Sequence, residues 1–335
     1  MITTTELTDQ LPEETVDAVV IGGGAAGLNG ALMLVRSRRS VVVIDSGAPR
    51  NAPAAGVHGL LGLDGTPPAD LLRRGREEVR GYGGRIVAGE VTSVRPAAPS
   101  ADGDLRFAVT LADGRTLQAR RVLIATGLRD VLPEVPGLAE HWGHSVVHCP
   151  YCHGWEVRDE PIGILAAGPA SLHHALLFRQ LTDDLVYFTR GTELGEDARG
   201  RFAARNIRVV DTPVDAVVAA PDGGIAGVRL SDGQVVPRRV LAVATTLQAR
   251  TDGLLELGLP MADLPNGMGR HFATGMAGTT EVPGVWVAGN ATDLMAQVGA
   301  SAAAGALAGA HINAHLAAAD TEAAFAAAQR DLTRV

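Results

Sequence analysis

The fold is decided by the stretch VDAVVIGGGAAG, which occupies residues 16–27 and runs from a short apolar strand into a glycine-rich turn. The turn has the Gly-x-Gly-x-x-Gly spacing of a dinucleotide-binding site. Gly22 permits the tight turn, Gly24 lets the backbone approach a pyrophosphate, and Gly27 lets the following helix pack on the strand. The N–H groups at the start of that helix then bind phosphate. The stretch predicts a nucleotide-binding α/β unit, and the alternative is a glycine-rich turn without a ligand.

The residues that follow are typical of a parallel α/β sheet. A helical stretch from Leu28 to about Arg36 precedes a second strand at 41–44, which ends at Asp45. The Asp45 carboxylate comes 21 residues after Gly24, where such a group can hold a ribose hydroxyl. Two neighbouring residues complete this candidate nucleotide site, Ala26 and Ser46.

The same plan returns, weakly, in the second half of the chain. A strand at 162–166, a turn at 167–169, a helix at 171–181 and a strand at 185–189 form a second βαβ pattern. Each half then continues through a hairpin region and closes with a buried strand. A late strand at 285–288 and the small-residue helix behind it have no place in the second half. We therefore expect them to return to the first one.

Composition bounds the partners and the location. The chain has 335 residues, enough for two domains of ordinary size, and a net charge of −8. Acids and arginines are mixed along it without a basic stripe, which argues against nucleic acid as a partner. Residues 1–14 lack the pattern of a signal peptide, and the most apolar run, 300–316, is Ala/Gly-rich and broken by polar residues. We expect no membrane partner and a cytoplasmic location.

The chain has only two cysteines, which lie in the run HCPYCHGW at residues 148–155. A Cys-x-x-Cys pair such as Cys149 and Cys152 can close a small disulfide ring, and one thiolate can lower the pKa of the other. In a reducing compartment a lone pair of this kind favours catalysis or metal binding over a structural disulfide. Redox chemistry is the favoured interpretation, and an inert pair is one alternative.

Zinc is the other alternative, because histidines crowd the cysteine pair. Their spacing is irregular and no second Cys-x-x-Cys exists, so we expect no metal site. His153 directly follows the second cysteine, where an imidazole can take or return a proton. A polar surface or capping histidine is the alternative interpretation. The four histidines are His141, His144, His148 and His153.

The second turn, AAGPAS at 166–171, is a degraded fingerprint. An alanine stands where the first glycine is expected, and Pro169 lacks an N–H group. The next strand leads to a single arginine, Arg190, where a 2′-phosphate site usually carries more positive charge. Binding of NADPH or NADH is therefore disfavoured, although Arg199 and Arg201 lie nearby and could rebuild a site.

Five features in order resemble the low-molecular-weight thioredoxin reductase family of flavoproteins, over roughly residues 16–316. They are the first turn, the triplet Ala125-Thr126-Gly127, the central Cys-x-x-Cys, the second βαβ unit and the late run GNATD at 289–293. The resemblance implies an α/β protein with two Rossmann-like, three-layer ββα nucleotide-binding domains, the second inserted in the first. An FAD-binding domain would comprise residues 14–132 and 258–320. An inserted NAD(P)-binding-like domain, 133–257, would carry the cysteines.

The resemblance also assigns site residues. Cys152 would lie next to the flavin, and Cys149 would exchange with the substrate. Gln297 and Val298 fall where the family helix meets the flavin ring. The complete cofactor site expected in this way is Gly22, Gly24, Ala26, Gly27, Asp45, Ser46, Arg50, Asn51, Val91, Ala125, Thr126, Gly127, Gly289, Asn290, Gln297 and Val298.

Three departures from the family pattern bear on the activity. His153 stands where reductases of the family carry Asp, Asn290 replaces the Asp of a Gly-Asp motif, and a two-arginine phosphate motif is reduced to Arg190. A Cys-x-x-Cys-His-Gly run with a weak nicotinamide site resembles the dithiol oxidase branch, which closes disulfides in sulfur-containing natural products and passes electrons from FAD to oxygen. The resemblance thus implies a homodimer that oxidises a small-molecule dithiol, with His153 as proton shuttle.

Two rival functions remain. An NAD(P)H-dependent reductase of thioredoxin, or of a similar small redox protein, would pass electrons in the opposite direction through the same cysteines. A non-catalytic flavoprotein that senses redox state or zinc would instead signal through a partner.

Overall fold

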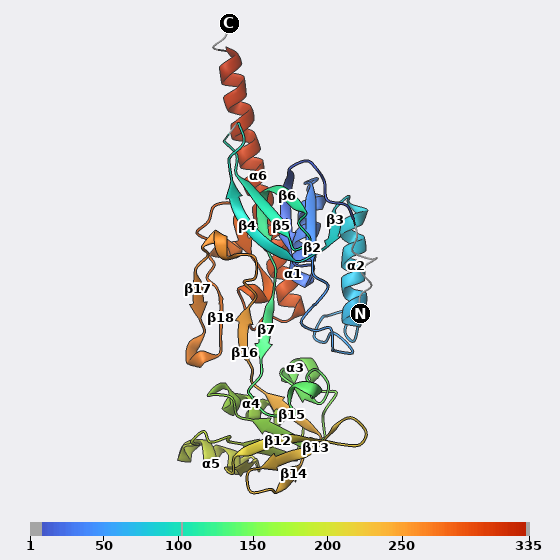
Figure 1. Cartoon of the computed structure of the whole chain (residues 1–335), viewed down its shortest axis with the longest axis vertical. Coiled ribbons are helices and arrows are strands. Elements are labelled where there is room, and N and C mark those ends of the chain that lie inside the picture. The colour runs from blue at the N-terminus through green and yellow to red at the C-terminus, as the bar shows by residue number, and fades with distance from the viewer. Residues whose placement is uncertain (1–8, 102, 333–335) are drawn as a thin grey trace.

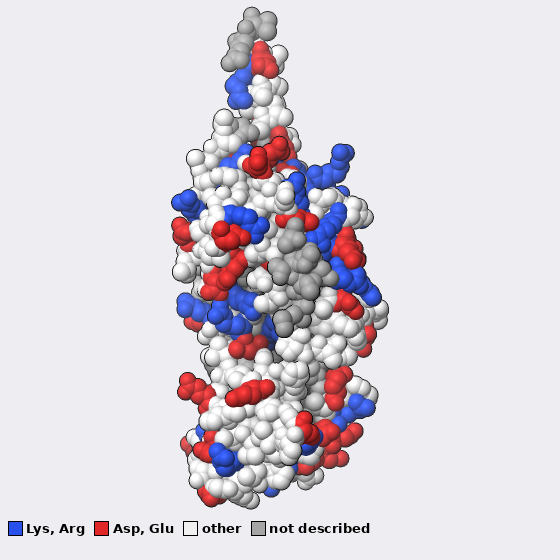
Figure 2. All heavy atoms as spheres, turned by 45° about the vertical axis from the view of Figure 1, so that its right-hand side comes forward, with Lys and Arg blue, Asp and Glu red and all other residues white. Residues whose placement is uncertain are grey.

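The computed structural model describes residues 9–101 and 103–332 and shows two bodies joined by paired strands (Figure 1). We call the body built on the larger, seven-stranded sheet the first unit, and the body built on the five-stranded sheet the second unit. On the face shown in Figure 2, basic and acidic side chains are interspersed rather than gathered into a continuous basic stripe.

The first unit is centred on β1 (Val16–Ile21), whose residues Ala18 to Val20 are fully buried. This strand pairs in parallel with β2 (Val41–Asp45) on one side and β6 (Thr116–Ile124) on the other. Burial on both faces explains its continuous apolar sequence. The other elements of this sheet and its covering helix are β3 (Arg85–Ala88), β4 (Val91–Ala97), β5 (Arg106–Leu111), β19 (Val285–Val287) and α2 (Pro68–Gly81).

Two helices pack closely against each other on this sheet, α1 (Ala25–Arg36) and α6 (Val298–Leu332). Small residues make the approach possible: a Cβ at Gly305 would lie 1.9 Å from the carbonyl oxygen of Ala26. The C-terminal part of α6 extends beyond the body of the first unit (Figure 1). Within the described part of the chain, α6 included, no helix is both long and apolar enough to cross a membrane.

The second unit repeats the parallel arrangement. Its sheet has the order β11-β10-β9-β15-β8, with β9 (Ile162–Leu165) between β10 (Leu185–Phe188) and β15 (Val240–Val243). An antiparallel three-stranded sheet covers it, as the turn signals predicted. The remaining elements are β8 (Val146–Val147), α3 (Pro150–His153), α4 (Ala170–Phe178), α5 (Glu196–Ala204), β11 (Arg208–Val210), β12 (Val214–Ala219), β13 (Ile225–Leu230) and β14 (Val235–Pro237).

Between the two units runs an antiparallel pair of strands, β7 (Leu128–Val131) and β16 (Thr246–Ala249) (Figure 1). They belong to a four-stranded sheet with β17 (Met261–Asp263) and β18 (Gly269–Phe272). Short 3-10 helices lie at Ala139–His141, Leu255–Leu257, Pro265–Gly267, Met276–Gly278 and Gly289–Ala291.

The α/β class and the pair of Rossmann-like units are confirmed. The late strand returns to the first sheet as expected, since Val285 lies opposite Val122 of β6 in a parallel register. The chain therefore enters the second unit and comes back. The assignment of particular residue limits to the two domains stays a prediction.

Candidate active site

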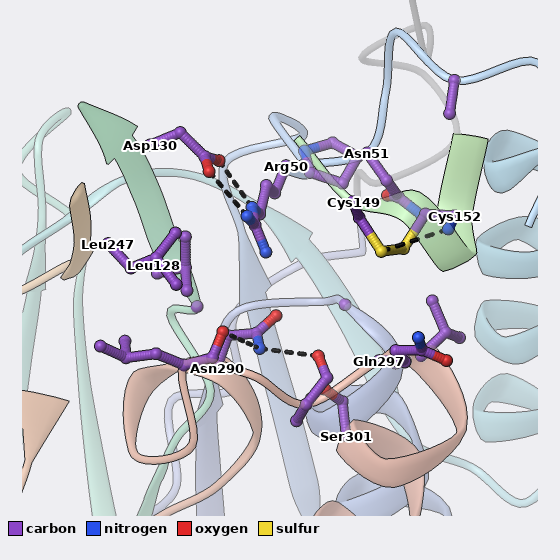
Figure 3. Close-up of a pocket in the computed structure, with 18 of the residues that line it drawn as sticks. Arg50, Asn51, Leu128, Asp130, Cys149, Cys152, Leu247, Asn290, Gln297 and Ser301 are labelled. Carbon is purple, nitrogen blue, oxygen red and sulfur yellow. Dashed lines mark hydrogen bonds and ion pairs between the residues drawn. A yellow bond between two sulfur atoms is a disulfide. The ribbon is translucent and has the colours of Figure 1, made fainter. Parts of the chain in front are cut away.

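One cavity of about 1010 Å³ is lined by residues of both units. The first glycine-rich turn, which belongs to the first unit, lines this cavity. So does the cysteine pair, which belongs to the second unit (Figure 3). Fourteen of the expected cofactor residues line it: Gly22, Gly24, Ala26, Asp45, Ser46, Arg50, Asn51, Val91, Ala125, Thr126, Gly127, Asn290, Gln297 and Val298. Cys149, Cys152 and His153 line the same cavity.

The first turn is shaped to receive an anion. Gly24 is the N-cap of α1, no side chain caps the helix, and its first turn holds no acidic residue. The first N–H groups of α1 are therefore available to a ligand. A Cβ on Gly24 would meet nothing within 4 Å, whereas one on Gly22, where φ is +106°, would lie 2.3 Å from the Ala125 carbonyl oxygen. The backbone at Gly22 is thus closely packed, while the space beside Gly24 is open.

Two expected cofactor residues, Gly27 and Gly289, are not among the residues that line the cavity. A Cβ on Gly27 would lie 1.9 Å from the carbonyl oxygen of Gly22, and one on Gly289 would lie 2.7 Å from the Cβ of Ala26. Both glycines therefore allow close packing around the first turn.

The segment before α6 and the first turn of that helix also line the cavity. Asn290 ties this segment together, because its side-chain amide donates to the carbonyl oxygens of Asp293 (2.9 Å) and Ala296 (2.8 Å). Gln297 and Val298 follow directly and line the cavity. The side chain of an aspartate at 290 would have no N–H group to make these bonds. Asn290 therefore stabilises a loop conformation that an aspartate side chain could not.

The two cysteines form a disulfide, with their Cα atoms 5.2 Å apart (Figure 3). Cys149 is the N-cap of α3, and the backbone N–H of Cys152 donates to the Cys149 sulfur at 3.2 Å. Pro150 begins the helix without losing a needed donor. When the disulfide is reduced, this N–H stabilises a thiolate on Cys149.

His153, at the end of α3, is a half-buried base. Burial lowers the pKa of its imidazole, against an opposing effect of the Glu156 carboxylate, while His58 lowers the pKa further. Its Nε2 atom is buried and has no hydrogen-bond partner among the described residues. The ring is therefore held largely neutral beside Cys152. Its role as proton shuttle stays a prediction.

His148, which the sequence offered only as a possible metal ligand, is placed as a second base. Its Nδ1 lies 3.0 Å from the carbonyl oxygen of Val243. We assign the ring proton to Nδ1, because only an N–H group can bond to a carbonyl oxygen. Nε2 is then the free basic nitrogen of a residue that lines the cavity and directly precedes Cys149. Burial lowers the pKa of this histidine.

His174, on α4, supports this arrangement from behind. Its Nε2–H group donates to the backbone carbonyl of His148, and its ring packs edge-on against Phe178 at 4.8 Å between centroids. Burial lowers the pKa of His174 to about 4. The neutral ring therefore fixes the backbone immediately before the disulfide.

The second turn has lost donors that the first turn keeps. The N–H of Ala167 donates to the Ser171 hydroxyl at 3.0 Å, and Pro169 has no N–H group. Arg190 donates from Nη1 to the carbonyl oxygen of Ala166 at 2.8 Å. These groups are thus engaged within the protein. Among the described residues, no three side chains of His, Cys, Asp or Glu gather in a way that could hold a metal ion.

The family model for pyridine nucleotide-disulphide oxidoreductases matches residues 16–307. The chain belongs to this family. Thioredoxin reductase tcpT of Claviceps purpurea is 36% identical to it over 259 residues, which cover 75% of this chain and 79% of that protein. The crystal structure of HlmI is 43% identical, with a TM-score of 0.88, over 97% of this chain and all of that one. An oxidoreductase from Agrobacterium tumefaciens is 32% identical, with a TM-score of 0.82, over 90% of this chain and 99% of that one.

The protein is therefore an enzyme of the disulfide oxidoreductase class and a member of a flavoprotein family. The resemblance to thioredoxin reductases drawn from the motifs is confirmed. The alternative of a non-catalytic sensor is set aside, because the family is one of enzymes.

Proposed function

We propose that the protein is an FAD-dependent dithiol oxidase, which converts a small-molecule dithiol into an intramolecular disulfide with oxygen as electron acceptor. The observation that carries the proposal is the contrast between the two nucleotide turns. Both turns precede a helix without a side-chain cap, but the second turn has lost donors that the first one keeps. There the N–H of Ala167 bonds to Ser171, residue 169 is a proline without an N–H, and Arg190 bonds to a carbonyl of the turn. The protein then has a site for a flavin that can accept electrons, but only a weak site for NADPH as an electron donor.

The residues at the first turn fit FAD. The open position at Gly24 leaves room for a pyrophosphate beside the N–H groups of α1. Asp45, at the end of β2, lines the same cavity and would accept from a ribose hydroxyl. The cavity continues past Gln297 to the disulfide. When bound there, the flavin supplies the two-electron acceptor that oxygen re-oxidises.

Thiol–disulfide exchange can then proceed in two displacements. A substrate thiolate attacks the Cys149 sulfur, the Cys149–Cys152 bond breaks, and Cys152 leaves as a thiolate. The second substrate thiolate attacks the substrate sulfur of this mixed disulfide, and Cys149 leaves. The N–H of Cys152 at 3.2 Å from the Cys149 sulfur favours that departure. The substrate loses two electrons and two protons, and the cysteine pair gains them.

The protons need bases close to the disulfide. His148, with Nε2 as its free nitrogen, is suited to deprotonate the incoming thiol, because a thiolate is the attacking species. His153 follows Cys152 and has a buried, unpartnered Nε2, so it is suited to exchange a proton with that cysteine after Cys152 has left as a thiolate. Both histidines have a lowered pKa, chiefly through burial, which keeps them neutral and able to accept protons near pH 7.

An anaerobic reduction of the purified yellow protein tests the proposal. Dithiothreitol should bleach the flavin absorbance near 450 nm rapidly, and admitting air should restore it with formation of hydrogen peroxide. NADPH at the same concentration should bleach it at least about ten times more slowly. Rapid bleaching by micromolar NADPH, followed by reduction of thioredoxin, would instead establish the rival reductase, a name carried by several relatives.

A further inference from the structure

A chain of four side chains connects the first unit to His148. Arg50, on the loop after β2, forms a two-pronged ion pair with Asp130 of β7, with Nε–Oδ2 at 2.6 Å and Nη2–Oδ1 at 2.7 Å (Figure 3). The Thr245 hydroxyl donates to the same Asp130 Oδ1 at 2.8 Å. The Thr245 oxygen lies 3.3 Å from Nδ1 of His148.

The shorter contacts of this chain agree on one direction. The backbone N–H of Thr245 also lies 3.4 Å from Nδ1 of His148, but that contact is longer than the 3.0 Å bond between Nδ1 and the Val243 carbonyl, which requires a hydrogen on Nδ1. Asp130 only accepts, so the Thr245 hydroxyl must point its hydrogen toward that carboxylate. The Thr245 oxygen is then left as an acceptor toward the Nδ1–H group of His148. The Val243 carbonyl accepts the same proton. Both contacts keep the hydrogen on Nδ1 and the lone pair on Nε2.

The four residues come from different parts of the fold. Arg50 belongs to the first unit and His148 to the second. Asp130 lies on β7 and Thr245 directly precedes β16, the two paired strands between the units. The Asp130 side chain is only 5% exposed, so its charge is poorly screened. The contacts can exist together only while the two units keep this mutual orientation.

We propose that the Arg50–Asp130–Thr245 relay positions His148, fixing its tautomer and its proton affinity in this orientation of the two units. The catalytic use of the relay rests on the proposed function. Asp130 and Thr245 are positioning residues, since they act through His148 and not on the substrate. His148 therefore has its basic Nε2 only in the orientation of the two units in which the disulfide lines the cavity between them.

The charged and titratable groups that act on His148 come from four parts of the fold. They are Arg50 from the loop after β2, Asp130 from β7, His153 from α3 and His174 from α4. Burial lowers the pKa of His148, the Asp130 carboxylate raises it, and Arg50 and His153 lower it. Removing the Asp130 charge therefore moves this pKa downward.

Histidine NMR titration of the FAD-bound enzyme tests the coupling without using turnover. The imidazole C–H signal of His148 is identified by its loss in His148→Gln. We expect its midpoint to fall by at least about half a pH unit in Asp130→Asn. It should stay near the wild-type value in Thr245→Val, where the charge remains. Asp215→Asn, which breaks an exposed Asp–Arg pair on β12, is the control and should leave it unchanged.

Oxygen consumption with dithiothreitol, measured against pH, tests the catalytic use. The rising limb of kcat/KM should move to lower pH in Asp130→Asn and keep its position in Thr245→Val. The plateau should fall several-fold in both, because the base is weaker in one variant and misoriented in the other. The ionisation of dithiothreitol itself is common to all variants. Asp215→Asn should match the wild type in both respects.

The outcomes separate the two proposals. An unchanged His148 midpoint in Asp130→Asn overturns the relay, whatever the activity. A shifted midpoint with an unchanged pH profile overturns its catalytic use. A wild-type enzyme that binds FAD but consumes no oxygen with any dithiol overturns the proposed function and the catalytic use, while the NMR titration still decides whether the relay controls His148.

Discussion

Arg190 donates from Nη1 to the carbonyl oxygen of Ala166 at 2.8 Å, so the arginine that follows the strand is bonded to the turn where the pyrophosphate would lie. Burial lowers the pKa of this guanidinium, and the residue has a positive φ of +50°. Arg190 thus bonds to the second turn itself, in the place where a bound phosphate would need it.

Substitution of Arg190 should therefore leave dithiol chemistry intact. In Arg190→Ala we expect the rate of flavin bleaching by dithiothreitol to stay within about two-fold of wild type, because exposed or semi-exposed polar changes away from the reacting atoms have small effects. Stopped-flow absorbance under argon measures it. A wild-type enzyme that NADPH reduces quickly, and an Arg190→Ala variant that it does not, would show that Arg190 binds the cofactor phosphate.

The first turn can be tested by filling the space at Gly24. A Cβ there meets no protein atom within 4 Å, so Gly24→Val should fold, but its side chain would occupy the place of the pyrophosphate. We expect FAD occupancy of the purified protein to fall below about a tenth of the wild-type value. Absorbance after gel filtration measures this.

Gly195→Val is the matched control for Gly24→Val. Gly195 is also an uncapped helix N-cap, at the start of α5, and also has open space around a Cβ. It should retain full FAD occupancy. Equal occupancy in the two variants would move the nucleotide site away from the first turn.

The roles of the two cysteines can be read from the flavin spectrum. Cys149→Ser leaves Cys152 as a free thiol, and we expect a broad absorbance band beyond 500 nm from a Cys152 thiolate close to the flavin. Cys152→Ser should lack it. The band in Cys152→Ser alone would reverse the assignment, making Cys149 the flavin-side cysteine.

The parts of the fold visible in the sequence are those set by local patterns. The first strand, its turn and the following helix occupy neighbouring residues, and each carries its own signal at positions 16–36. The last helix was expected around 300–316, but it continues to Leu332. Its second half is rich in alanine, a strong helix former that carries no amphipathic pattern.

The role of His148 as a base could not be predicted from the sequence, because it depends on contacts between residues that are far apart in the chain. His148 gains its role from Val243, which lies 95 residues away in the chain, and the Arg50–Asp130 pair spans 80 residues. Neither contact leaves a spacing that a motif could record. The crowd of histidines near the cysteines was visible, but which ring faces the cavity with a fixed tautomer depends on tertiary packing.

The buried histidine behind the site makes stability depend on pH. The pKa of His174 is lowered to about 4 by burial, whereas an unfolded chain has a histidine pKa of about 6.5. As the pH falls below about 6.5, the unfolded chain takes up a proton that the folded chain refuses until about pH 4. Stability present at neutral pH is therefore lost on acidification, by about 2–3 kcal/mol between pH 7 and 4.5 from this residue.

His174→Leu should remove that part of the pH dependence. The variant loses the bond to the His148 carbonyl, so it should be less stable than wild type at pH 7 by about 1–2 kcal/mol. The difference should shrink or reverse at pH 4.5, because leucine has no proton to refuse. Urea denaturation of the FAD-bound proteins at both pH values measures the change, and His144→Gln, at an exposed histidine, serves as the control. A His174→Leu enzyme with the full wild-type pH dependence would show that His174 is not held neutral in the folded protein.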